Sequence, residues 1–262
     1  MRDRAKARNL FDDEVELAIG DFADPSSVRA ALEGVDGVLL SGADDPRRVG
    51  WETSAIDAAA AAGVGRIVKL STIGAEPGAP VAFWDWHGQV ERHLRASGVG
   101  AVILQSSFYM SNLLAAADQV ADAGRLYAPA GEARIAMIDP RDVGAAAASV
   151  LTGAGRDGET YVVTGPEAIT YTQVAAELST AVGRVVEFVD VPGEGAKEAL
   201  TAAGVPAFVA EQLVKIFEML RQGAAEHVTD WVELLTGSPP RSFGAFARDH
   251  AQLFAPVASG AR

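Results

Sequence analysis

Short apolar runs alternate with longer helical patterns through the first part of the chain, and this alternation constrains the fold more than any other feature. Strands are predicted over residues 15–19, 35–40, 66–70 and 101–105. Helices are predicted over 51–62 and 84–96, where apolar residues recur on one helix face and a glycine follows shortly after the end. Such alternation indicates a parallel sheet covered by helices on both faces. Binding and catalysis are then expected beyond the carboxyl ends of the strands.

The later part of the chain has a looser rhythm, which predicts a smaller lobe attached to the sheet. Helices are predicted over 111–123, 140–151, 172–182, 196–203, 208–221 and 243–254, and strands over 160–164 and 185–191. We therefore predict an α/β fold, with a Rossmann-like doubly wound parallel sheet in residues 1–155 and a smaller C-terminal α/β lobe in residues 156–262. The boundary is placed in the stretch from Gly153 to Gly158.

Charge and composition exclude several classes of function. The chain carries 35 acidic and 22 basic side chains, giving a formal net charge of −13, which repels a nucleic-acid backbone. It has no cysteine to form disulfides or thiolate metal sites, and its 4 histidines lack the spacing of metal ligands. No stretch reaches the roughly 20 apolar residues of a membrane span. The sequence therefore predicts a cytoplasmic protein that binds no metal, nucleic acid or membrane.

Several short motifs occur along the chain in a characteristic order. They are Gly20-Asp21-Phe22, Val68-Lys69-Leu70-Ser71, the segment from His87 to Glu91, the segment from Phe108 to Leu114, and the segment from Ile138 to Val143. In this order they resemble the NmrA-like family of the atypical short-chain dehydrogenase superfamily, and the resemblance extends over almost the whole chain. It implies an NAD(P)-binding Rossmann domain with a small substrate lobe. The family includes NADPH-dependent quinone reductases, other reductases, and regulators that sense the cofactor without transforming it.

The glycine-rich turn that opens a dinucleotide-binding fold is not found in the sequence. That turn lets the backbone close on the cofactor pyrophosphate at a helix N-terminus. The glycines within 34–42 and 63–65 have a different spacing and are interpreted as ordinary turns. Aligned with the family by pattern, Met1 falls where the second strand ends, so an opening unit of about 30 residues is expected to be missing. Either the reading frame starts too late or the sheet is rearranged, and cofactor binding is expected to be impaired.

The resemblance assigns cofactor contacts to residues in three parts of the chain. Arg2 matches the basic residue that pairs with the 2′-phosphate of NADP, which favours NADP(H) over NAD(H). Asp21 and Phe22 match the residues beside the adenine, although Asp21 equally fits a turn cap before a helix. Small residues at two strand ends are expected beside the nicotinamide and its ribose: Ser41, Gly42, Ala43, Ser71, Thr72 and Ile73.

His87 and Glu91 stand where the superfamily has its catalytic tyrosine and lysine, and Ser71 stands at the position of the catalytic serine. The i, i+4 spacing predicts contact between His87 and Glu91, which would favour a protonated histidine able to give a proton to a reduced carbonyl or quinone. The alternative is a surface ion pair on a partly exposed helix. Tyr109 is a second candidate proton donor, and the aromatic residues within 83–86 either flank a flat ring or pack on the lobe.

Two functions from different classes fit these residues. The first is an NAD(P)H-dependent oxidoreductase that reduces a quinone or a conjugated carbonyl compound, with the protein supplying orientation and a proton. The second is a non-catalytic NAD(P)-sensing or protein-interaction module with a degenerate cofactor site, which the unmatched tyrosine and lysine favour. The apolar face of residues 208–220 fits either a homodimer contact or packing on the sheet.

Overall fold

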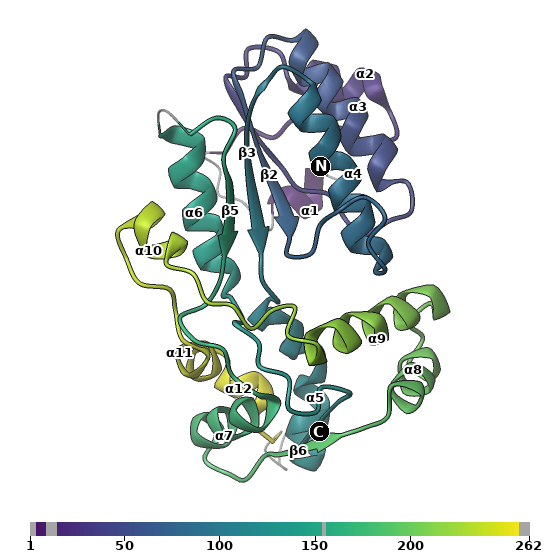
Figure 1. Ribbon diagram of the computed structural model, residues 1–262, viewed down its shortest axis with the longest axis vertical. Coiled ribbons are helices and arrows are strands. Elements are labelled where there is room, and N and C mark those ends of the chain that lie inside the picture. The colour runs from purple at the N-terminus through teal and green to yellow at the C-terminus, as the bar shows by residue number, and fades with distance from the viewer. Residues whose placement is uncertain (1–3, 9–14, 154–155, 257–262) are drawn as a thin grey trace.

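The larger of two sheets forms the centre of the molecule in the computed structural model, which describes residues 4–8, 15–153 and 156–256. Its strands lie side by side in the order β1 (Gly37–Leu40), β2 (Arg66–Thr72), β3 (Gly100–Ser106) and β5 (Thr160–Val163). Every pairing between them is parallel, so their carboxyl ends meet at one edge of the sheet. The predicted α/β fold with a parallel sheet is thus confirmed (Figure 1).

Helices cover both faces of this sheet, as the apolar strands predict (Figure 1). The short helix α1 (Arg4–Arg8) comes first in the chain. One face is covered by α2 (Pro25–Ala31), α3 (Arg48–Ala61) and α4 (Ala82–Ala96). The other face is covered by α6 (Pro140–Thr152) and α10 (Trp231–Thr236). Each face therefore has its own apolar core.

Strand β2 contributes to both cores because side chains alternate between the two faces of a sheet. Ile67 lies in the core beneath α3 and α4, whereas Val68 lies in the core beneath α6. Lys69 and Ser71 share the face of Ile67, and each contacts a side chain of α3 or α4. Two polar residues of the central sheet are therefore directed into the layer between β2 and these helices.

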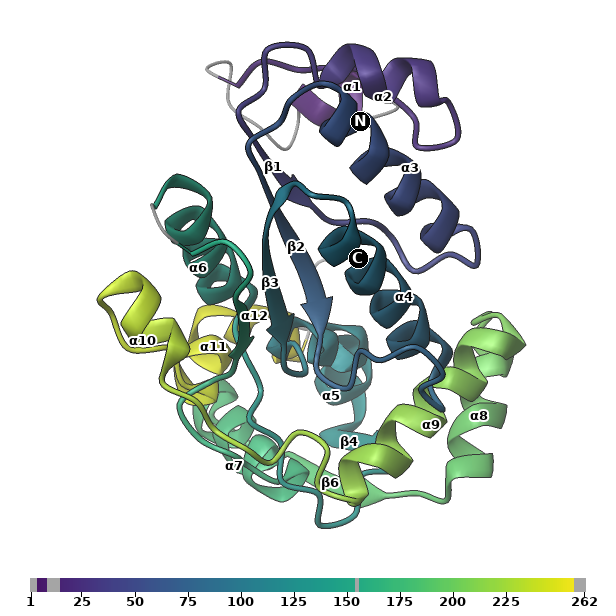
Figure 2. The same cartoon turned by 45° about the horizontal axis from the view of Figure 1, so that its top comes forward.

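A lobe lies beyond the carboxyl edge of the large sheet (Figure 2). Its small parallel sheet pairs β4 (Arg125–Ala128) with β6 (Glu187–Asp190). Its helices are the 3-10 helix η1 (Met110–Ala116), α5 (Ala117–Ala123), α7 (Tyr171–Val182), α8 (Gly193–Ala202), α9 (Ala207–Arg221), α11 (Phe243–Asp249) and α12 (Ala251–Phe254). The lobe has a separate core that includes the buried rings of Phe243, Phe246 and Phe254. None of the described helices is both long and apolar enough to cross a bilayer.

Some predicted elements differ from the structure. The segment 15–19 is not a strand, since Val15 is 48% and Ile19 41% exposed, and among the described residues β1 pairs only with β2. A segment with an alternating pattern forms a strand only where a neighbouring strand is available to hydrogen-bond with its backbone. The predicted helix over 111–123 begins as η1, and the one over 243–254 is divided at His250 into α11 and α12. Helix α10 lies outside every predicted helix.

The two sheets are interleaved along the chain. Strand β4 belongs to the lobe, whereas β5, which follows it in the sequence, belongs to the large sheet. Ser106 of β3 pairs with Val163 of β5, so a division at residue 155 does not separate the two sheets. The chain leaves the sheet domain after β3 and returns to it for α6 and β5, and no linker marks either crossing.

Candidate functional site

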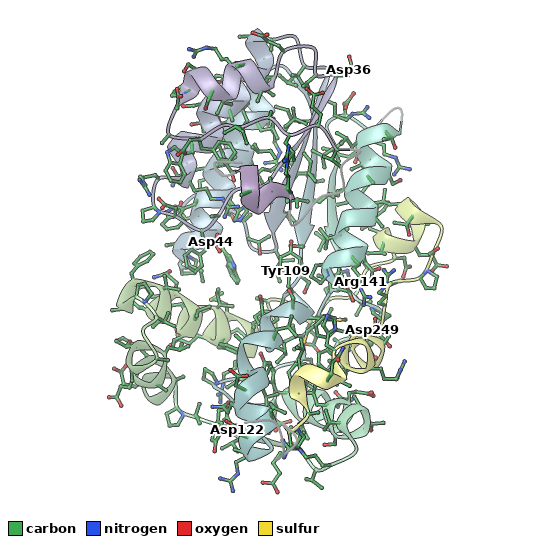
Figure 3. All side chains as sticks on the ribbon, turned by 180° about the vertical axis from the view of Figure 1, so that it is seen from behind. Asp36, Asp44, Tyr109, Asp122, Arg141 and Asp249 are labelled. Atoms are coloured by element: carbon green, nitrogen blue, oxygen red, sulfur yellow. The ribbon has the colours of Figure 1, made fainter. Side chains whose placement is uncertain are left out.

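A cavity of about 1150 Å³ lies between the carboxyl edge of the large sheet and the lobe. Its wall on the sheet side includes Ser41 after β1, Ser71 at the end of β2, Ser106 at the end of β3, and His87 of α4. Helices α8 and α9 form the opposite wall with apolar side chains. Figure 3 shows Tyr109 where the sheet domain meets the lobe. The cavity thus occupies the edge at which parallel strands predict a site.

Most of the predicted site residues line this cavity. They come from segments that are far apart in the sequence, and the parallel strand ends bring them together. Those that line it are Ser41, Gly42, Ser71, Thr72, Ile73, His87 and Tyr109. Ala43 follows Gly42 in the chain but does not line the cavity.

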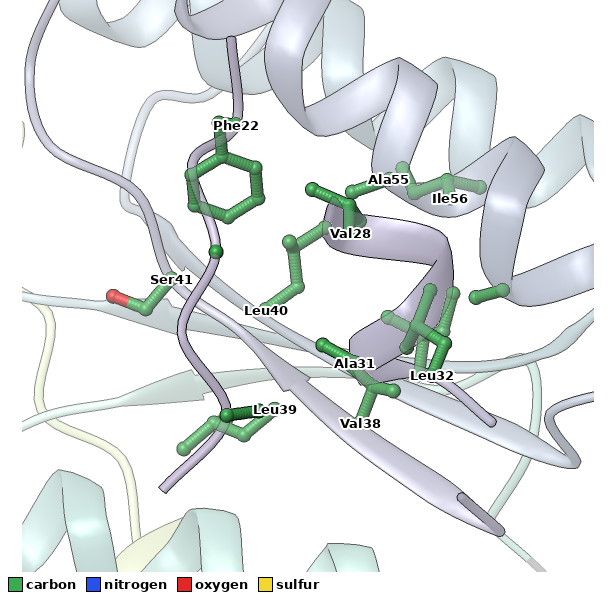
Figure 4. Close-up of a pocket in the computed structure, with 14 residues that line it drawn as sticks. Phe22, Val28, Ala31, Leu32, Val38, Leu39, Leu40, Ser41, Ala55 and Ile56 are labelled. Atoms are coloured by element: carbon green, nitrogen blue, oxygen red, sulfur yellow. The ribbon is translucent and has the colours of Figure 1, made fainter. Parts of the chain in front are cut away.

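The residues assigned to the adenine lie elsewhere. Phe22 lines a separate apolar cavity of about 210 Å³, on which Val28 of α2 and Ile56 of α3 also converge (Figure 4). Asp21 lines neither cavity, and its Oδ1 accepts a hydrogen bond from the Ala23 backbone amide at 3.0 Å. This is the turn-capping role that was the alternative for Asp21.

The two cavities share one residue, Ser41, at the end of β1. The polar part of the predicted site therefore gathers in the larger cavity, and the smaller one is lined almost entirely by aliphatic side chains with the ring of Phe22. Arg2, predicted to bind the 2′-phosphate of NADP, lies outside the described residues.

His87 and Glu91 are both buried, at 8% and 1% exposure, so the alternative of a surface ion pair is wrong. The predicted contact between them is also wrong. Glu91 instead accepts hydrogen bonds from Ser71 Oγ, from Gln105 Nε2 at 3.0 Å and from Arg95 at 3.0 Å. The i, i+4 spacing does place both residues on one helix face. That face lies on the sheet, and the sheet supplies Ser71 and Gln105 as partners, whereas Arg95 belongs to α4 itself.

Burial holds the pKa of His87 well below its usual value of 6.5, and the nearby cations of Lys69 and Arg48 lower it further. The predicted protonated histidine is therefore wrong, because the imidazole is neutral at neutral pH. Its Nδ1 lies 3.3 Å from Lys69 Nζ and 3.3 Å from Ser71 Oγ. A neutral imidazole carries one N–H, so it can donate one hydrogen bond and accept another.

A cluster of buried charges behind the cavity was not predicted from the sequence. Lys69 in β2 is fully buried, and its Nζ lies 3.1 Å from Glu52 Oε2. Glu52 is also paired with Arg48, whose Nε lies 3.0 Å from Oε1. Burial lowers the pKa of Lys69 to about 8, although the charge of Glu52 opposes this shift. The available signal was a lysine within the apolar strand 66–70, because lysine is almost never buried unless it is paired.

Gly42 is needed at the end of β1 because this cluster leaves no room for a side chain there. A Cβ at Gly42 would lie 2.5 Å from Glu52 Oε1. Arg48 holds the turn that follows, since its guanidinium donates to the Gly42 carbonyl at 2.9 Å and pairs with Asp44 at 2.5 Å. The buried charges therefore fix the backbone that forms one wall of the cavity.

Helix α4 is anchored at its N-terminus by the lobe. Its N-cap residue, Val81, makes no side-chain capping bond, and Oε1 of Gln212 in α9 accepts from the Ala82 amide at 2.7 Å instead. Beside this bond, Trp86 of α4 stacks on Phe208 of α9 with ring centroids 5.9 Å apart. Trp86 therefore packs on the lobe, which was one of the two predicted roles, while Phe83 and Trp84 line the large cavity.

The chain is similar to known reductases over nearly its whole length. An NAD(P)H azoreductase of Xenophilus azovorans is 38% identical over 97% of this chain and 89% of its own length. A (4-alkanoyl-5-oxo-2,5-dihydrofuran-3-yl)methyl phosphate reductase of Streptomyces griseus subsp. griseus is 40% identical over 92% of this chain and 85% of its own length.

The fold is that of NAD(P)-binding reductases. The crystal structure of an NADPH-dependent quinone oxidoreductase from Escherichia coli, complexed with NADPH, superposes with a TM-score of 0.86 and 30% identity, covering 95% of this chain and 88% of that one. A sequence profile of the NmrA-like family matches residues 1–236. Sequence and fold therefore agree, and the chain belongs to the NmrA-like family.

Proposed function

We propose that this chain is an NAD(P)H-dependent oxidoreductase that reduces a quinone or another conjugated carbonyl compound. The observation that carries the proposal is a neutral, buried histidine, His87, on the wall of a large cavity at the carboxyl edge of a parallel sheet. The relatives support it by their named activities, an NAD(P)H azoreductase and an NADPH-dependent quinone oxidoreductase.

The residues at the strand ends fit the nicotinamide half of the cofactor. Ser41, Gly42 and Ser71 are small, so a flat ring and its ribose can approach the sheet edge closely. Ser107 lines the same cavity, and its buried Oγ has no hydrogen-bond partner among the described residues, so it is available to a bound molecule. When bound, NAD(P)H supplies a hydride.

NADPH is proposed as the preferred form of the cofactor. Arg2 matches the family's ligand for the 2′-phosphate, and a guanidinium group pairs well with a phosphate by its fork geometry. The quinone oxidoreductase with a similar fold is complexed with NADPH. A preference for NADH over NADPH in binding would contradict this assignment.

The wall formed by the lobe favours a flat, apolar substrate. Helices α8 and α9 present aliphatic and aromatic side chains such as Leu213 and Phe217. Among the described residues that line the cavity, the acidic, basic and imidazole side chains are on the sheet side: Asp44, Arg48 and His87. An apolar wall binds a ring by burial and keeps water from the reacting carbon. These properties suit quinones, whose polar groups are carbonyl oxygens.

His87 is the group placed to hand over a proton. Reduction of a quinone to a hydroquinone consumes one hydride and one proton, and the imidazole lines the cavity where the proton is needed. Ser71 Oγ donates to Glu91 and lies 3.3 Å from His87 Nδ1, so we assign it to accepting the hydrogen of the imidazole when Nδ1 carries it. Tyr109 lines the same cavity and is the second candidate donor.

Cofactor binding and turnover together test the proposed function. Calorimetry on the purified chain measures binding of NADPH and NADH, and the loss of NADPH absorbance measures turnover with a naphthoquinone and with an azo dye. We expect NADPH to bind more tightly than NADH and to be consumed when the quinone is added. Binding of NADPH with no reduction of any of these acceptors would overturn the proposal and favour an NAD(P)-sensing module. Binding of neither cofactor would overturn the oxidoreductase and leave the protein-interaction module.

A further inference from the structure

Lys69 lies behind the cavity wall without lining the cavity, and its ammonium group has polar neighbours from β2, α3 and α4. Its Nζ donates to the carbonyl oxygen of Leu70, lies 3.3 Å from His87 Nδ1 and forms an ion pair with Glu52 Oε2 at 3.1 Å. An ammonium group has donors only, so the two hydrogen bonds and the ion pair are all favourable when the lysine is charged. The arrangement therefore stabilises a buried cation in direct contact with the imidazole.

The charges around Lys69 balance when it is protonated and His87 is neutral. Helix α3 directs Arg48 and Glu52 toward it, and α4 directs His87 and Glu91 toward it. Three cations and three anions form the paired cluster: Arg48, Lys69, Arg95, Asp44, Glu52 and Glu91. A buried ionic group is tolerated when its partners compensate it in this way.

His87 Nδ1 has two neighbours, one of which requires it to accept a hydrogen bond and the other to donate one. Lys69 Nζ, at 3.3 Å, can only donate while it is charged, so Nδ1 must accept from it. Ser71 Oγ, also at 3.3 Å, already donates its one hydrogen to Glu91, so toward Nδ1 it can only accept. A neutral imidazole has one hydrogen, and the protonation of Lys69 therefore decides which neighbour is satisfied.

We propose that Lys69 is a positioning residue that sets the tautomer of His87 and supplies, through it, the proton used in the cavity. With Lys69 charged, the hydrogen of His87 is on Nε2, which has no hydrogen-bond partner among the described side chains and lies on the ring edge away from the cluster. With Lys69 neutral, the hydrogen is on Nδ1 and is donated to Ser71, so Nε2 presents a lone pair. The catalytic part of this inference rests on the proposed function.

The proton transfer balances without creating a charged imidazole. Nε2 gives its hydrogen to the substrate oxygen while Nδ1 takes the hydrogen that Lys69 held against it, so the lysine ends as a neutral amine. Without Lys69, His87 could release that hydrogen only by becoming an imidazolate, which is a very strong base. Burial lowers the pKa of Lys69 to about 8, which makes the lysine a competent proton source near neutral pH. After the product leaves, solvent returns a proton to Nε2 while Nδ1 passes its hydrogen back to Lys69, which restores the charged lysine.

Nitrogen NMR on the full chain, labelled with ¹⁵N at histidine, reads the tautomer directly. Loss of its signals in His87→Asn assigns the residue. We expect the wild-type hydrogen on Nε2 at neutral pH and on Nδ1 at high pH, with a midpoint near the Lys69 pKa of about 8. Lys69→Met should hold the hydrogen on Nδ1 at every pH and lower kcat for quinone reduction about 100-fold, with KM for NADPH unchanged. The matched control is Lys215→Met, because Lys215 is on α9 and pairs with Glu211.

A wild-type His87 that keeps one tautomer throughout the titration overturns the proposal, and this result needs no variant. A folded Lys69→Met with its hydrogen still on Nε2 overturns it as well. A tautomer change with the expected midpoint supports the role of Lys69 even in a chain that reduces no quinone. In that case it is the proposed function that fails, so the two failures are distinguishable.

Discussion

The two walls of the large cavity are built from different chemistry. The sheet side holds Ser71 and His87, with Glu52, Lys69 and Glu91 buried behind them, whereas the side formed by α8 and α9 is aliphatic and aromatic. Removal of one residue from a buried ionic cluster leaves an uncompensated charge. Apolar side chains of similar volume, in contrast, can often replace one another. Under the proposed function, the sheet domain supplies the proton and the lobe selects which substrate fits.

Replacing His87 by glutamine tests the sheet wall and should have the largest effect. Glutamine keeps a polar side chain but cannot transfer a proton, so kcat for quinone reduction should fall about 100-fold while KM changes little. Steady-state kinetics with NADPH and one quinone measure both constants. His93→Gln is the matched control, because His93 is on the same helix but pairs with Asp57 at the surface. Equal losses in the two variants would show that α4, rather than His87, is what matters.

Truncating Phe217 tests the lobe wall. This ring lines the cavity and packs against Phe108 and Tyr171, at centroid distances of 6.1 and 5.8 Å. Phe217→Ala removes apolar area from the substrate side, so KM for a large quinone should rise about tenfold with kcat nearly unchanged. Phe208→Ala is the control, since Phe208 stacks on Trp86 and does not line the cavity. A fall in kcat without a change in KM would contradict the assignment of substrate binding to the lobe wall.

Removing the Gln212 side chain tests the bond that joins the walls and should have the smallest effect. Gln212→Ala leaves the amide of Ala82 without its acceptor, so the free energy of unfolding should fall by about 1–2 kcal/mol. Chemical denaturation monitored by tryptophan fluorescence measures the change. Gln222→Ala is the control, because Gln222 follows α9 and is exposed. If both variants unfold alike, the hydrogen bond between Gln212 and Ala82 adds no stability to the contact between the walls.

The sheet could be predicted from the sequence because the burial of a strand on both faces is visible in the composition of that strand. The runs 66–70 and 101–105 match β2 and β3 closely, since strands covered on both sides are apolar throughout. The segment 15–19 has an equally clear pattern but forms no strand, because a strand also depends on a neighbour that the segment itself does not encode. The hydrophobic pattern therefore predicts which segments can form strands, and the arrangement of the strands in the fold decides which of them do.

The site was predicted in part for the same reason. Residues at strand ends, such as Ser41 and Ser71, could be identified because parallel strands deliver their ends to one edge. The contact expected between His87 and Glu91 was derived from helix spacing alone, whereas both residues bond to side chains of the sheet and Glu91 also bonds to Arg95 of its own helix. Lys69 was missed because its partners are on two different helices, and only the packed structure brings these together.

The hydrogen bond between Ala82 and Gln212 sets a practical boundary for engineering. Positions of α8 and α9 that line the cavity are suited to randomisation, because the proposed function assigns them to substrate binding and not to proton transfer. Gln212 is on the same helix, but it holds the end of the helix that carries His87. A library that fixed this single glutamine could change substrate choice while rate is preserved, whereas one that varied it would mix the two traits in every selected clone.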